Sequence, residues 1–288
     1  MIVDGKLLAQ SLLDILKADV GALQKKGITP TLAVILIGDD PASLAYIKQK
    51  QKAAETIGAR VLFDHQPPAL TAGGLYNLIT KYNKDTAVHG LIVQRPIPKE
   101  VGVVNDTLDD VLPSKDVDGF LPGSPFEVPV AMAVGEILRT IYTAQLPVND
   151  TTPQHHKEFT GWLKDKHIVV IGRGQTAGTP IFHFLQKRGT KVTQIHSQTP
   201  DPETHIKKAD IVISCVGRER IVARESVKPG AILISVGLWR DSEGKLRGDY
   251  EEADISDVAG WYTPTPGGVG PVNVACLMQN LIKACKMK

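Results

Sequence analysis

The segment that most constrains this 288-residue chain is a short β-branched run that ends in closely spaced glycines. Residues 168–171 predict a buried strand, and the apolar periodicity of residues 181–185 predicts a helix. Between them lie Gly172, Gly174 and Gly178, in the pattern Gly-x-Gly-x-x-x-Gly. A tight glycine turn lets the backbone approach a phosphate, and the helix N-terminus offers it unpaired N–H groups. An ordinary strand–helix turn is the alternative, since the spacing is one residue longer than the common dinucleotide fingerprint.

The next predicted strand, residues 191–196, bears on which dinucleotide such a turn would hold. A typical NAD site has an acidic residue near the end of this strand, which hydrogen-bonds the ribose 2′-hydroxyl. Here the strand is followed by Ser197-Gln198-Thr199, and Arg173 lies in the glycine turn. A cation and a hydroxyl suit a 2′-phosphate, which carries extra charge and acceptor oxygens. We therefore predict NADP as the cofactor; the alternative is that Arg173 is a solvated turn residue.

Composition narrows the class of protein. The length favours two domains, and 42% hydrophobic with 22% charged residues is ordinary for a globular protein. A formal charge of +2, with its lysines and arginines dispersed, gives no reason to expect nucleic acid as a partner. The three cysteines lack paired spacing, which favours a reducing compartment over a disulfide framework or a zinc site. The start of the chain lacks a signal-peptide pattern and no apolar run has membrane-spanning length, so we expect a cytoplasmic protein.

The order of predicted elements indicates an α/β fold. Strands at 31–37, 60–63 and 88–94 alternate with helices at 7–25, 43–57, 71–82 and 101–112, which predicts right-handed βαβ units and a parallel sheet. We expect a helix at 130–142 and an irregular surface connection at 145–160, whose adjacent histidines, His155 and His156, are poorly spaced for a metal. A second α/β domain, of Rossmann type, follows with strands at 168–171, 191–196, 211–215, 231–236 and 260–263.

The predicted domains are therefore residues 1–140 and 141–270, with a ligand cleft between them. A carboxyl-terminal helix, predicted at 272–286, is expected to return to the first domain, so that residues 271–288 belong there.

Four residues of the first domain form a candidate site. Tyr46 and Lys50 are four apart on one predicted helix and so share a face. Gln94 ends a buried strand, where ligands of parallel sheets bind, and Asp118 lies in a loop rich in Gly and Asp. Taken singly, each has an ordinary explanation: Tyr46 as packing, Lys50 as part of a solvated lysine-rich face, Asp118 as a turn former.

With these residues assembled, nearly the whole chain resembles the methylenetetrahydrofolate dehydrogenase/methenyltetrahydrofolate cyclohydrolase family. Five motifs in order carry the resemblance: Tyr46-Ile-Lys-Gln-Lys50-Gln-Lys-Ala, Val88-His-Gly-Leu-Ile-Val-Gln94-Arg-Pro, Lys115-Asp-Val-Asp118-Gly, Val170-Ile-Gly-Arg-Gly and Thr263-Pro-Thr-Pro-Gly-Gly-Val-Gly-Pro271.

The resemblance implies NADP-dependent oxidation of 5,10-methylenetetrahydrofolate to the methenyl form and hydrolysis of that product to 10-formyltetrahydrofolate, within one-carbon metabolism and purine biosynthesis. It implies that Lys50 is central to hydrolysis, that Gln94 supports it, that Tyr46 stacks on the folate and that Asp118 holds the pterin. It also implies a homodimer formed through the dinucleotide-binding domain. Gly267, Gly268 and Pro271 are expected to lie against the substrate, and Gly172, Arg173, Gly174, Gly178 and Ser197 against the cofactor.

Several positions depart from the family pattern. Arg95 replaces the usual leucine, Gly174 replaces a serine, and Pro129-Val-Ala-Met132 and Val272-Asn273 replace other common sequences; the 145–160 connection is longer than usual. An added cation at Arg95 leaves open a dehydrogenase without cyclohydrolase activity. A non-catalytic folate- or nucleotide-binding module is a third hypothesis, against which the presence of Lys50, Gln94 and Asp118 argues.

Overall fold

The computed structural model describes residues 1–102, 110–146 and 155–287, and the chain divides into two compact units. The first unit comprises residues 9–129 and 274–288, and the second comprises residues 1–8 and 130–273. The sequence-based boundary was placed later, at 140/141, and did not separate the first eight residues. Two contacts explain the difference. A Cβ at Gly135 would meet the Phe184 ring at 2.9 Å, and Val3 donates to the carbonyl of Tyr262 at 2.9 Å.

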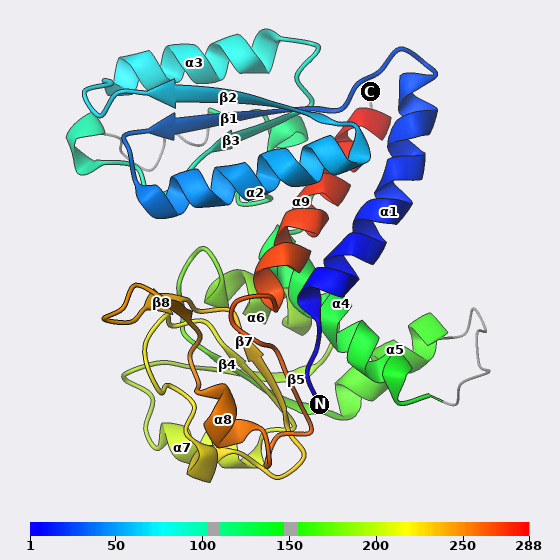
Figure 1. Ribbon diagram of the computed structural model, residues 1–288, viewed down its shortest axis with the longest axis vertical. Helices are drawn as coiled ribbons and strands as arrows, with labels where there is room; N and C mark the ends of the chain where they lie inside the picture. Colours follow the sequence, from blue (N-terminus) through cyan, green and yellow to red (C-terminus); the bar gives the residue numbers. More distant parts are fainter. Residues whose placement is uncertain (103–109, 147–154, 288) are drawn as a thin grey trace. The chain divides into compact units, whose positions relative to one another are not determined.

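The first unit is built on a parallel three-stranded sheet in the order β2-β1-β3. The central strand β1 (Thr31–Ile37) is buried along its whole length between β2 (Arg60–Gln66) and β3 (Gly90–Val93). Helices α2 (Pro41–Ile57) and α3 (Ala72–Lys84) cover opposite faces of this sheet (Figure 1). Side chains alternate along a strand, so every second residue of β1 packs with α3 and the residues between them face the other side of the sheet. The continuous apolar run of β1 therefore supplies apolar side chains to both faces.

Local signals fix the ends of these helices. Asp40 accepts a hydrogen bond from the Ser43 N–H at 2.7 Å at the start of α2, and Thr71 accepts one from the Gly74 N–H at 3.1 Å at the start of α3. Gly58, with φ of 80°, ends α2 in the left-handed conformation. Asp4 likewise accepts from the N–H groups of Lys6 and Leu7 at the start of α1 (Gly5–Gln24).

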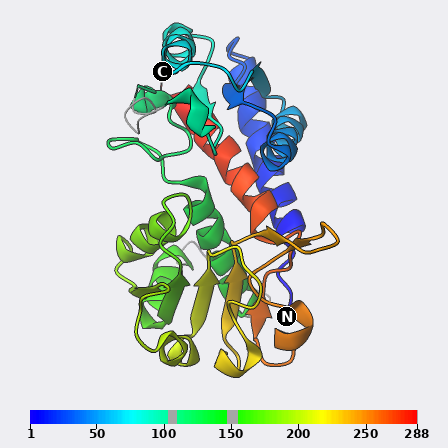
Figure 2. The ribbon, with the colours of Figure 1, turned by 90° about the vertical axis from the view of Figure 1, so that its left-hand side faces the viewer.

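The second unit contains a parallel five-stranded sheet in the order β10-β7-β6-β4-β5. Its strands are β4 (His167–Ile171), β5 (Lys191–Ile195), β6 (Ile211–Ser214), β7 (Ile232–Ser235) and β10 (Trp261–Tyr262). Figure 2 shows this sheet among its helices, which are α4 (Pro129–Ala144), α5 (His155–Asp165), α6 (Gly178–Gln186), α7 (Pro202–Lys208) and α8 (Glu252–Ile255). The order places β4 beside β5 on one side and β6 on the other.

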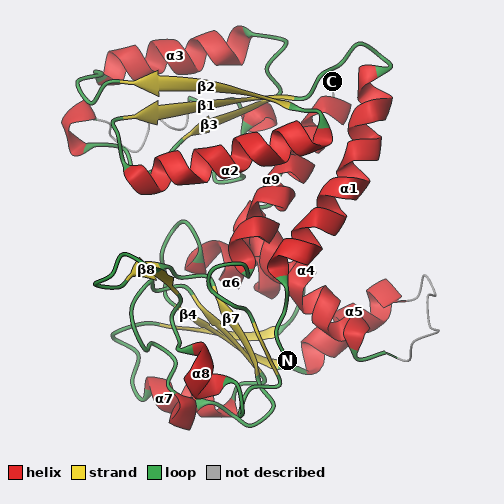
Figure 3. Cartoon of the chain, viewed as in Figure 1, coloured by secondary structure: helices red, strands yellow, loops and turns green. Residues whose placement is uncertain are grey.

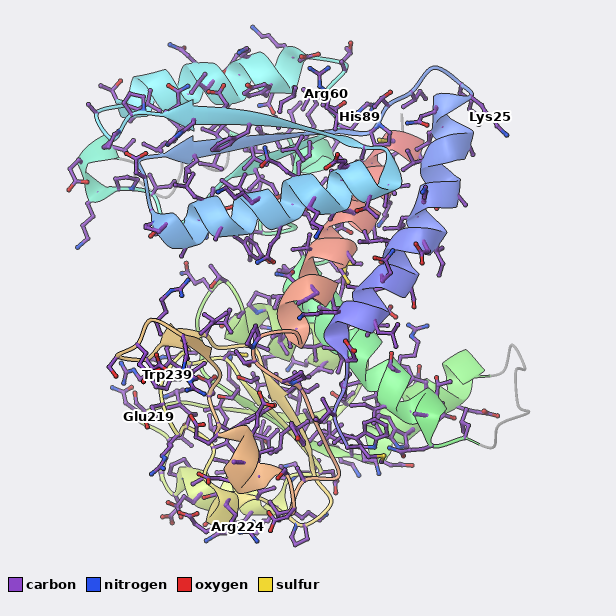
Figure 4. All side chains as sticks on the ribbon, in the orientation of Figure 1. Lys25, Arg60, His89, Glu219, Arg224 and Trp239 are labelled. Carbon is purple, nitrogen blue, oxygen red and sulfur yellow. The ribbon has the colours of Figure 1, made fainter. Side chains whose placement is uncertain are left out.

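A small antiparallel ribbon, β8 (Trp239–Arg240) with β9 (Leu246–Arg247), follows β7 (Figure 3). The Trp239 side chain, labelled in Figure 4, donates from Nε1 to the carbonyl of Gly248 at 2.7 Å. The ribbon is thereby tied to the segment that leads into Asp249.

The carboxyl-terminal helix α9 (Val269–Lys286) contributes its residues from Val274 onward to the first unit. The Asn280 side chain donates to the carbonyls of Val117 at 2.8 Å and Glu127 at 2.9 Å. Leu281 lies against Gly90 of β3. Among the described residues, no helix combines the length and apolarity needed to cross a bilayer.

Three element predictions need comment. Residues 155–160 are not irregular, because α5 begins at His155 and buries Phe159 and Leu163, four residues apart. The helix α9 begins at Val269 rather than residue 272, since Pro271 is tolerated in a first turn. The helix predicted at 101–112 lies mostly outside the described residues; before that gap, a short 3-10 turn (Lys99–Val101) ends at Gly102.

Candidate active site

The first unit contains a buried amine held by an amide. Lys50, on α2, is only 3% exposed, and its Nζ donates to Oε1 of Gln94 at 2.9 Å. The Gln94 amide nitrogen donates in turn to the carbonyl of Arg95 at 2.9 Å, which fixes the orientation of the amide. Lys48 and Lys52, the other lysines of the run, are exposed. The alternative that Lys50 belongs to a solvated lysine-rich face is therefore wrong.

Burial sets the protonation of this amine. Loss of hydration lowers the pKa of Lys50, and the negative charge of Asp118 acts in the opposite direction. Loss of hydration likewise raises the pKa of Asp118, against the positive charges of Lys50 and then Arg95. Nζ of Lys50 also lies 5.1 Å from the centre of the Tyr46 ring. The predicted Tyr46, Lys50, Gln94 and Asp118 are therefore brought together.

The loop that carries Asp118 is organised by its neighbour. Asp116, which is buried, accepts from the N–H groups of Gly119 at 3.1 Å and Leu121 at 2.9 Å. Gly119 has φ of 70°, and a Cβ there would lie 2.7 Å from the carbonyl oxygen of Phe126. Only glycine fits this turn, so the backbone on the carboxyl-terminal side of Asp118 has a fixed path.

Arg95 connects the loop after β3 to the Asp118 loop. Its guanidinium carbon lies 5.2 Å from the centre of the Phe120 ring, two residues beyond Asp118. The Arg95 carbonyl also accepts from Ser43 Oγ at 3.4 Å. The residue that departs from the family pattern therefore has its charge beside the Asp118 loop.

In the second unit, the glycine turn lies between β4 and α6. Gly172 has φ of 105°, and a Cβ there would lie 3.0 Å from the Cys215 carbonyl oxygen. A Cβ at Gly178 would overlap the Gly172 carbonyl oxygen, whereas one at Gly174 would meet nothing within 4 Å. The first and last glycines thus let the turn close on itself. The middle one borders open space, where another molecule can approach the backbone.

Arg173, Gly174 and Ser197 are exposed at the carboxyl ends of β4 and β5. The Gln194 side chain on β5 donates to the Gly172 carbonyl at 3.0 Å, which joins the two strand ends. Thr179 Oγ, in the first turn of α6, donates to the Arg173 carbonyl at 3.2 Å. The predicted cofactor residues therefore gather at one edge of the sheet, where ligands of parallel sheets bind.

Gly267, Gly268 and Pro271 lie at the start of α9. Gly267 has φ of 110°, and a Cβ at Gly268 would come within 2.6 Å of the Pro264 carbonyl oxygen. The α1 residue Gly5 is so close to the carbonyl oxygens of Gly267 and Gly268 that any side chain there would overlap them. The segment is packed tightly because backbone atoms occupy the space that side chains at Gly5 and Gly268 would need.

Sequence reasoning missed one buried carboxylate. Asp249 has no exposed surface and accepts hydrogen bonds from Ser214 and from three consecutive backbone N–H groups that follow β6. In the sequence, Asp249 stands between Gly248 and Tyr250, a pattern that is equally typical of an exposed turn. Nothing beside it in the sequence therefore indicates that it is buried.

The fold and the glycine turn define a two-domain α/β protein with one unit of the dinucleotide-binding type. Residues 3–118 match the family model described as tetrahydrofolate dehydrogenase/cyclohydrolase, catalytic domain. Residues 154–288 match the one described as tetrahydrofolate dehydrogenase/cyclohydrolase, NAD(P)-binding domain. The chain belongs to this tetrahydrofolate dehydrogenase/cyclohydrolase family of enzymes.

Individual members of the family are similar to this chain over nearly its whole length. The chain is 37% identical over 285 residues to the bifunctional protein FolD of Methylibium petroleiphilum, covering 99% of this chain and 97% of that protein. The crystal structure of the Campylobacter jejuni bifunctional FolD enzyme superposes with a TM-score of 0.89 at 33% identity, covering 100% and 99% of the two chains. The Trypanosoma brucei enzyme, solved with NADP cofactor and an inhibitor, gives 0.87 at 29% identity, covering 100% and 97%.

Proposed function

We propose that this enzyme oxidises 5,10-methylenetetrahydrofolate with NADP and hydrolyses the resulting 5,10-methenyltetrahydrofolate to 10-formyltetrahydrofolate. Family membership supports both reactions. The observation that supports hydrolysis is the buried Lys50 amine, which Gln94 holds at 2.9 Å. Burial lowers the pKa of this amine, and the charge of Asp118 acts in the opposite direction. We place the activity in one-carbon metabolism, with purine biosynthesis as a user of the formyl group.

Hydrolysis needs a group that handles a proton beside a cation. Methenyltetrahydrofolate is an amidinium-like cation, so water must add to its carbon and lose a proton. A neutral amine avoids repulsion with that cation and can accept the proton or orient the water. Burial lowers the pKa of Lys50 and so favours the neutral form. Gln94 fixes the amine by accepting its N–H, without adding charge to the site.

Two further side chains are assigned to the folate. The Asp118 carboxylate can accept the adjacent N–H donors of a 2-amino-4-oxopterin, which suits a carboxylate better than a neutral oxygen. The Tyr46 ring, on the same face of α2 as Lys50, offers a flat surface to the aminobenzoyl group. Gly267, Gly268 and Pro271 are proposed to contact the substrate through backbone that carries little side-chain bulk.

The residues at the edge of the second sheet suit NADP. Gly172 and Gly178 close the turn, and the open space at Gly174 admits a diphosphate to the backbone N–H groups at the start of α6. Arg173 and Ser197 are exposed at adjoining strand ends and would hold a 2′-phosphate. When bound, NADP supplies the hydride acceptor for the methylene carbon. Hydride transfer requires placement of the two reactants and no acid or base from the chain.

We also propose a cytoplasmic homodimer. The three cysteines are free thiols, which fits a reducing compartment. The resemblance to the family supports a dimer through the dinucleotide-binding unit. Light scattering of the purified chain would give about twice the mass of 31.1 kDa, and a monomeric mass would contradict the dimer.

A coupled absorbance assay tests the proposed activity. Purified protein is mixed with 5,10-methylenetetrahydrofolate and either NADP or NAD, and both reduced nucleotide and methenyl absorbance are followed. We expect reduced nucleotide to form faster with NADP, and methenyl absorbance to rise and then decay. Absence of reduced nucleotide with both cofactors would refute the oxidation.

A dehydrogenase without cyclohydrolase activity remains the second candidate, because Arg95 adds a cation beside the Asp118 loop. In that case reduced nucleotide would form and methenyl product would accumulate. The methenyl product would then decay only at the rate of uncatalysed hydrolysis. The same assay therefore separates the two candidates.

A further inference from the structure

Asp249 is an unusual acceptor of hydrogen bonds in the second unit. Its carboxylate has no exposed surface and accepts from Ser214 Oγ at 2.7 Å. It also accepts from the backbone N–H groups of Val216 at 3.0 Å, Gly217 at 2.7 Å and Arg218 at 2.9 Å. Four donors on one buried carboxylate compensate for its lost hydration and fix the loop that follows β6.

The surrounding backbone leaves this loop no freedom. Gly217 has φ of 72°, and a Cβ there would lie 2.9 Å from the Leu238 carbonyl oxygen. A Cβ at Gly237 would overlap both the Asp249 carboxylate and the Gly217 nitrogen. The carboxylate is therefore enclosed by the loops that follow β6 and β7.

A polar chain continues from Asp249 to the other strand ends. The Asp249 N–H donates to Ser235 Oγ at the end of β7 at 2.9 Å, and the Ser235 N–H donates to Thr263 Oγ at 2.9 Å. The Tyr250 hydroxyl donates to the Thr263 carbonyl at 2.7 Å. All four side chains are buried. The carboxyl ends of β6, β7 and β10 are thus held by one network centred on Asp249.

The direction of the backbone in this loop determines what it offers to a ligand. The peptide bonds joining Val216, Gly217 and Arg218 are trans, so each carbonyl points opposite to the N–H of the same peptide. Since the Gly217 and Arg218 N–H groups point at Asp249, the carbonyls of Val216 and Gly217 point away from it. The outer side of the loop therefore presents acceptors, which suit hydroxyl or amide N–H donors and would repel a phosphate.

The sheet order places this loop relative to the glycine turn. The strand β6 adjoins β4 on the side opposite β5. The Cys215 carbonyl oxygen lies 3.0 Å from the position of a Cβ on Gly172, so the two loops are in contact. With the adenosine-side ribose expected at the end of β5, the other half of a dinucleotide bound at the glycine turn extends over the end of β6.

We propose that Asp249 is a positioning residue for the nicotinamide-riboside half of the cofactor. It turns the carbonyls of Val216 and Gly217 outward, where they accept hydrogen bonds from ribose hydroxyl or carboxamide N–H donors. This inference rests on the proposed use of NADP. It assigns the phosphates to the glycine turn and the donor-bearing half to the loop after β6.

The test compares two probes, NADP and 2′,5′-ADP, which has the adenosine 2′-phosphate but no nicotinamide riboside. In Asp249→Asn, an amide N–H replaces one acceptor and opposes the N–H donors of the loop. We expect the Kd for NADP, measured by calorimetry, to rise at least tenfold, and the Kd for 2′,5′-ADP to change less than twofold. Hydrogen exchange at residues 216–218 should accelerate in the same variant.

Asp241→Asn is the matched control, because Asp241 also accepts backbone N–H groups, from Glu243 and Lys245, but in the β8–β9 ribbon. It should leave both constants unchanged. If Asp249→Asn does not fold, Ser214→Ala, which removes one donor and keeps the carboxylate, should weaken NADP alone to a smaller extent.

Equal weakening of NADP and 2′,5′-ADP in a folded variant would show a merely structural role and overturn the inference, as would an unchanged Kd for NADP. Failure of the unsubstituted protein to bind either probe would instead overturn the proposed use of NADP, and the inference with it.

Discussion

At the scale of single residues, the protonation of the site depends on which charged groups are buried near one another. Lys50 and Asp118 each lose hydration, which pushes the pKa of Lys50 down and that of Asp118 up, toward two neutral groups. Their mutual attraction works against this. The positive charge of Arg95 favours the ionised form of Asp118 as well. Arg95 therefore lowers the pKa of Asp118 against the effect of burial.

Replacing Arg95 should expose this effect in the pH dependence of folate binding. Arg95 lowers the pKa of Asp118, so Arg95→Leu should raise it, and the carboxylate will then accept a proton at a higher pH. We expect the KM for methylenetetrahydrofolate to increase on the acid side, with the onset of that increase moved to higher pH than in the unsubstituted enzyme.

Arg95→Lys, which keeps the positive charge, serves as the control and should retain the onset of the unsubstituted enzyme. Superimposable plots of KM against pH for the unsubstituted enzyme and Arg95→Leu would show that Arg95 has no influence on Asp118.

At the scale of elements, the glycine turn depends on two positions of opposite character. Gly178→Ala would drive a methyl group into the Gly172 carbonyl oxygen, whereas Gly174→Ala enters open space. We expect Gly178→Ala to lower the free energy of unfolding by about 1–3 kcal/mol and to weaken NADP binding. Gly174→Ala should leave stability within about 0.5 kcal/mol.

Urea unfolding followed by fluorescence measures both variants. The geometry of the turn would be contradicted if the two alanine substitutions changed stability equally, because their surroundings differ so sharply.

Local patterns predicted most elements, and their failures have physical causes. The continuous apolar run at β1 is a short-range signal, and the strand that it predicts was confirmed. The helix α5 was missed because its polar residues and nearby prolines obscured the spacing of Phe159 and Leu163. Helix ends moved by a few residues where a proline is compatible with the first turn, as at Pro271.

The site was only partly accessible from sequence. Tyr46 and Lys50 share a helix face by periodicity alone, but the acceptor that holds the Lys50 amine is Gln94, which is 44 residues away. Asp249 is farther beyond reach, because its donors lie 31 to 35 residues before it in the chain. Long-range partners of this kind leave no periodic signal in the residues around them.

At the scale of the whole molecule, the chain encodes two α/β units whose segments are not contiguous. The second unit takes the first eight residues, and the first unit takes the carboxyl-terminal helix from Val274 onward. In the first unit, Asn280 on that helix donates to the carbonyls of Val117 and Glu127, on either side of the Asp118 loop. The most carboxyl-terminal element thereby supports a site whose other residues come from the first 118 positions.

The central claim is that one enzyme carries out two reactions, of which only hydrolysis needs the buried amine. Lys50→Met removes that amine while keeping an unbranched side chain of similar length. Lys52→Met makes the same change at an exposed position of the same helix and serves as the control.

The decisive measurement is the rate of both partial reactions in these two variants. In Lys50→Met, we predict that hydrolysis of added methenyltetrahydrofolate falls at least about 100-fold, while NADP-dependent oxidation stays within a few-fold of the unsubstituted rate. Lys52→Met should retain both. Hydrolysis at the unsubstituted rate in Lys50→Met would contradict the account.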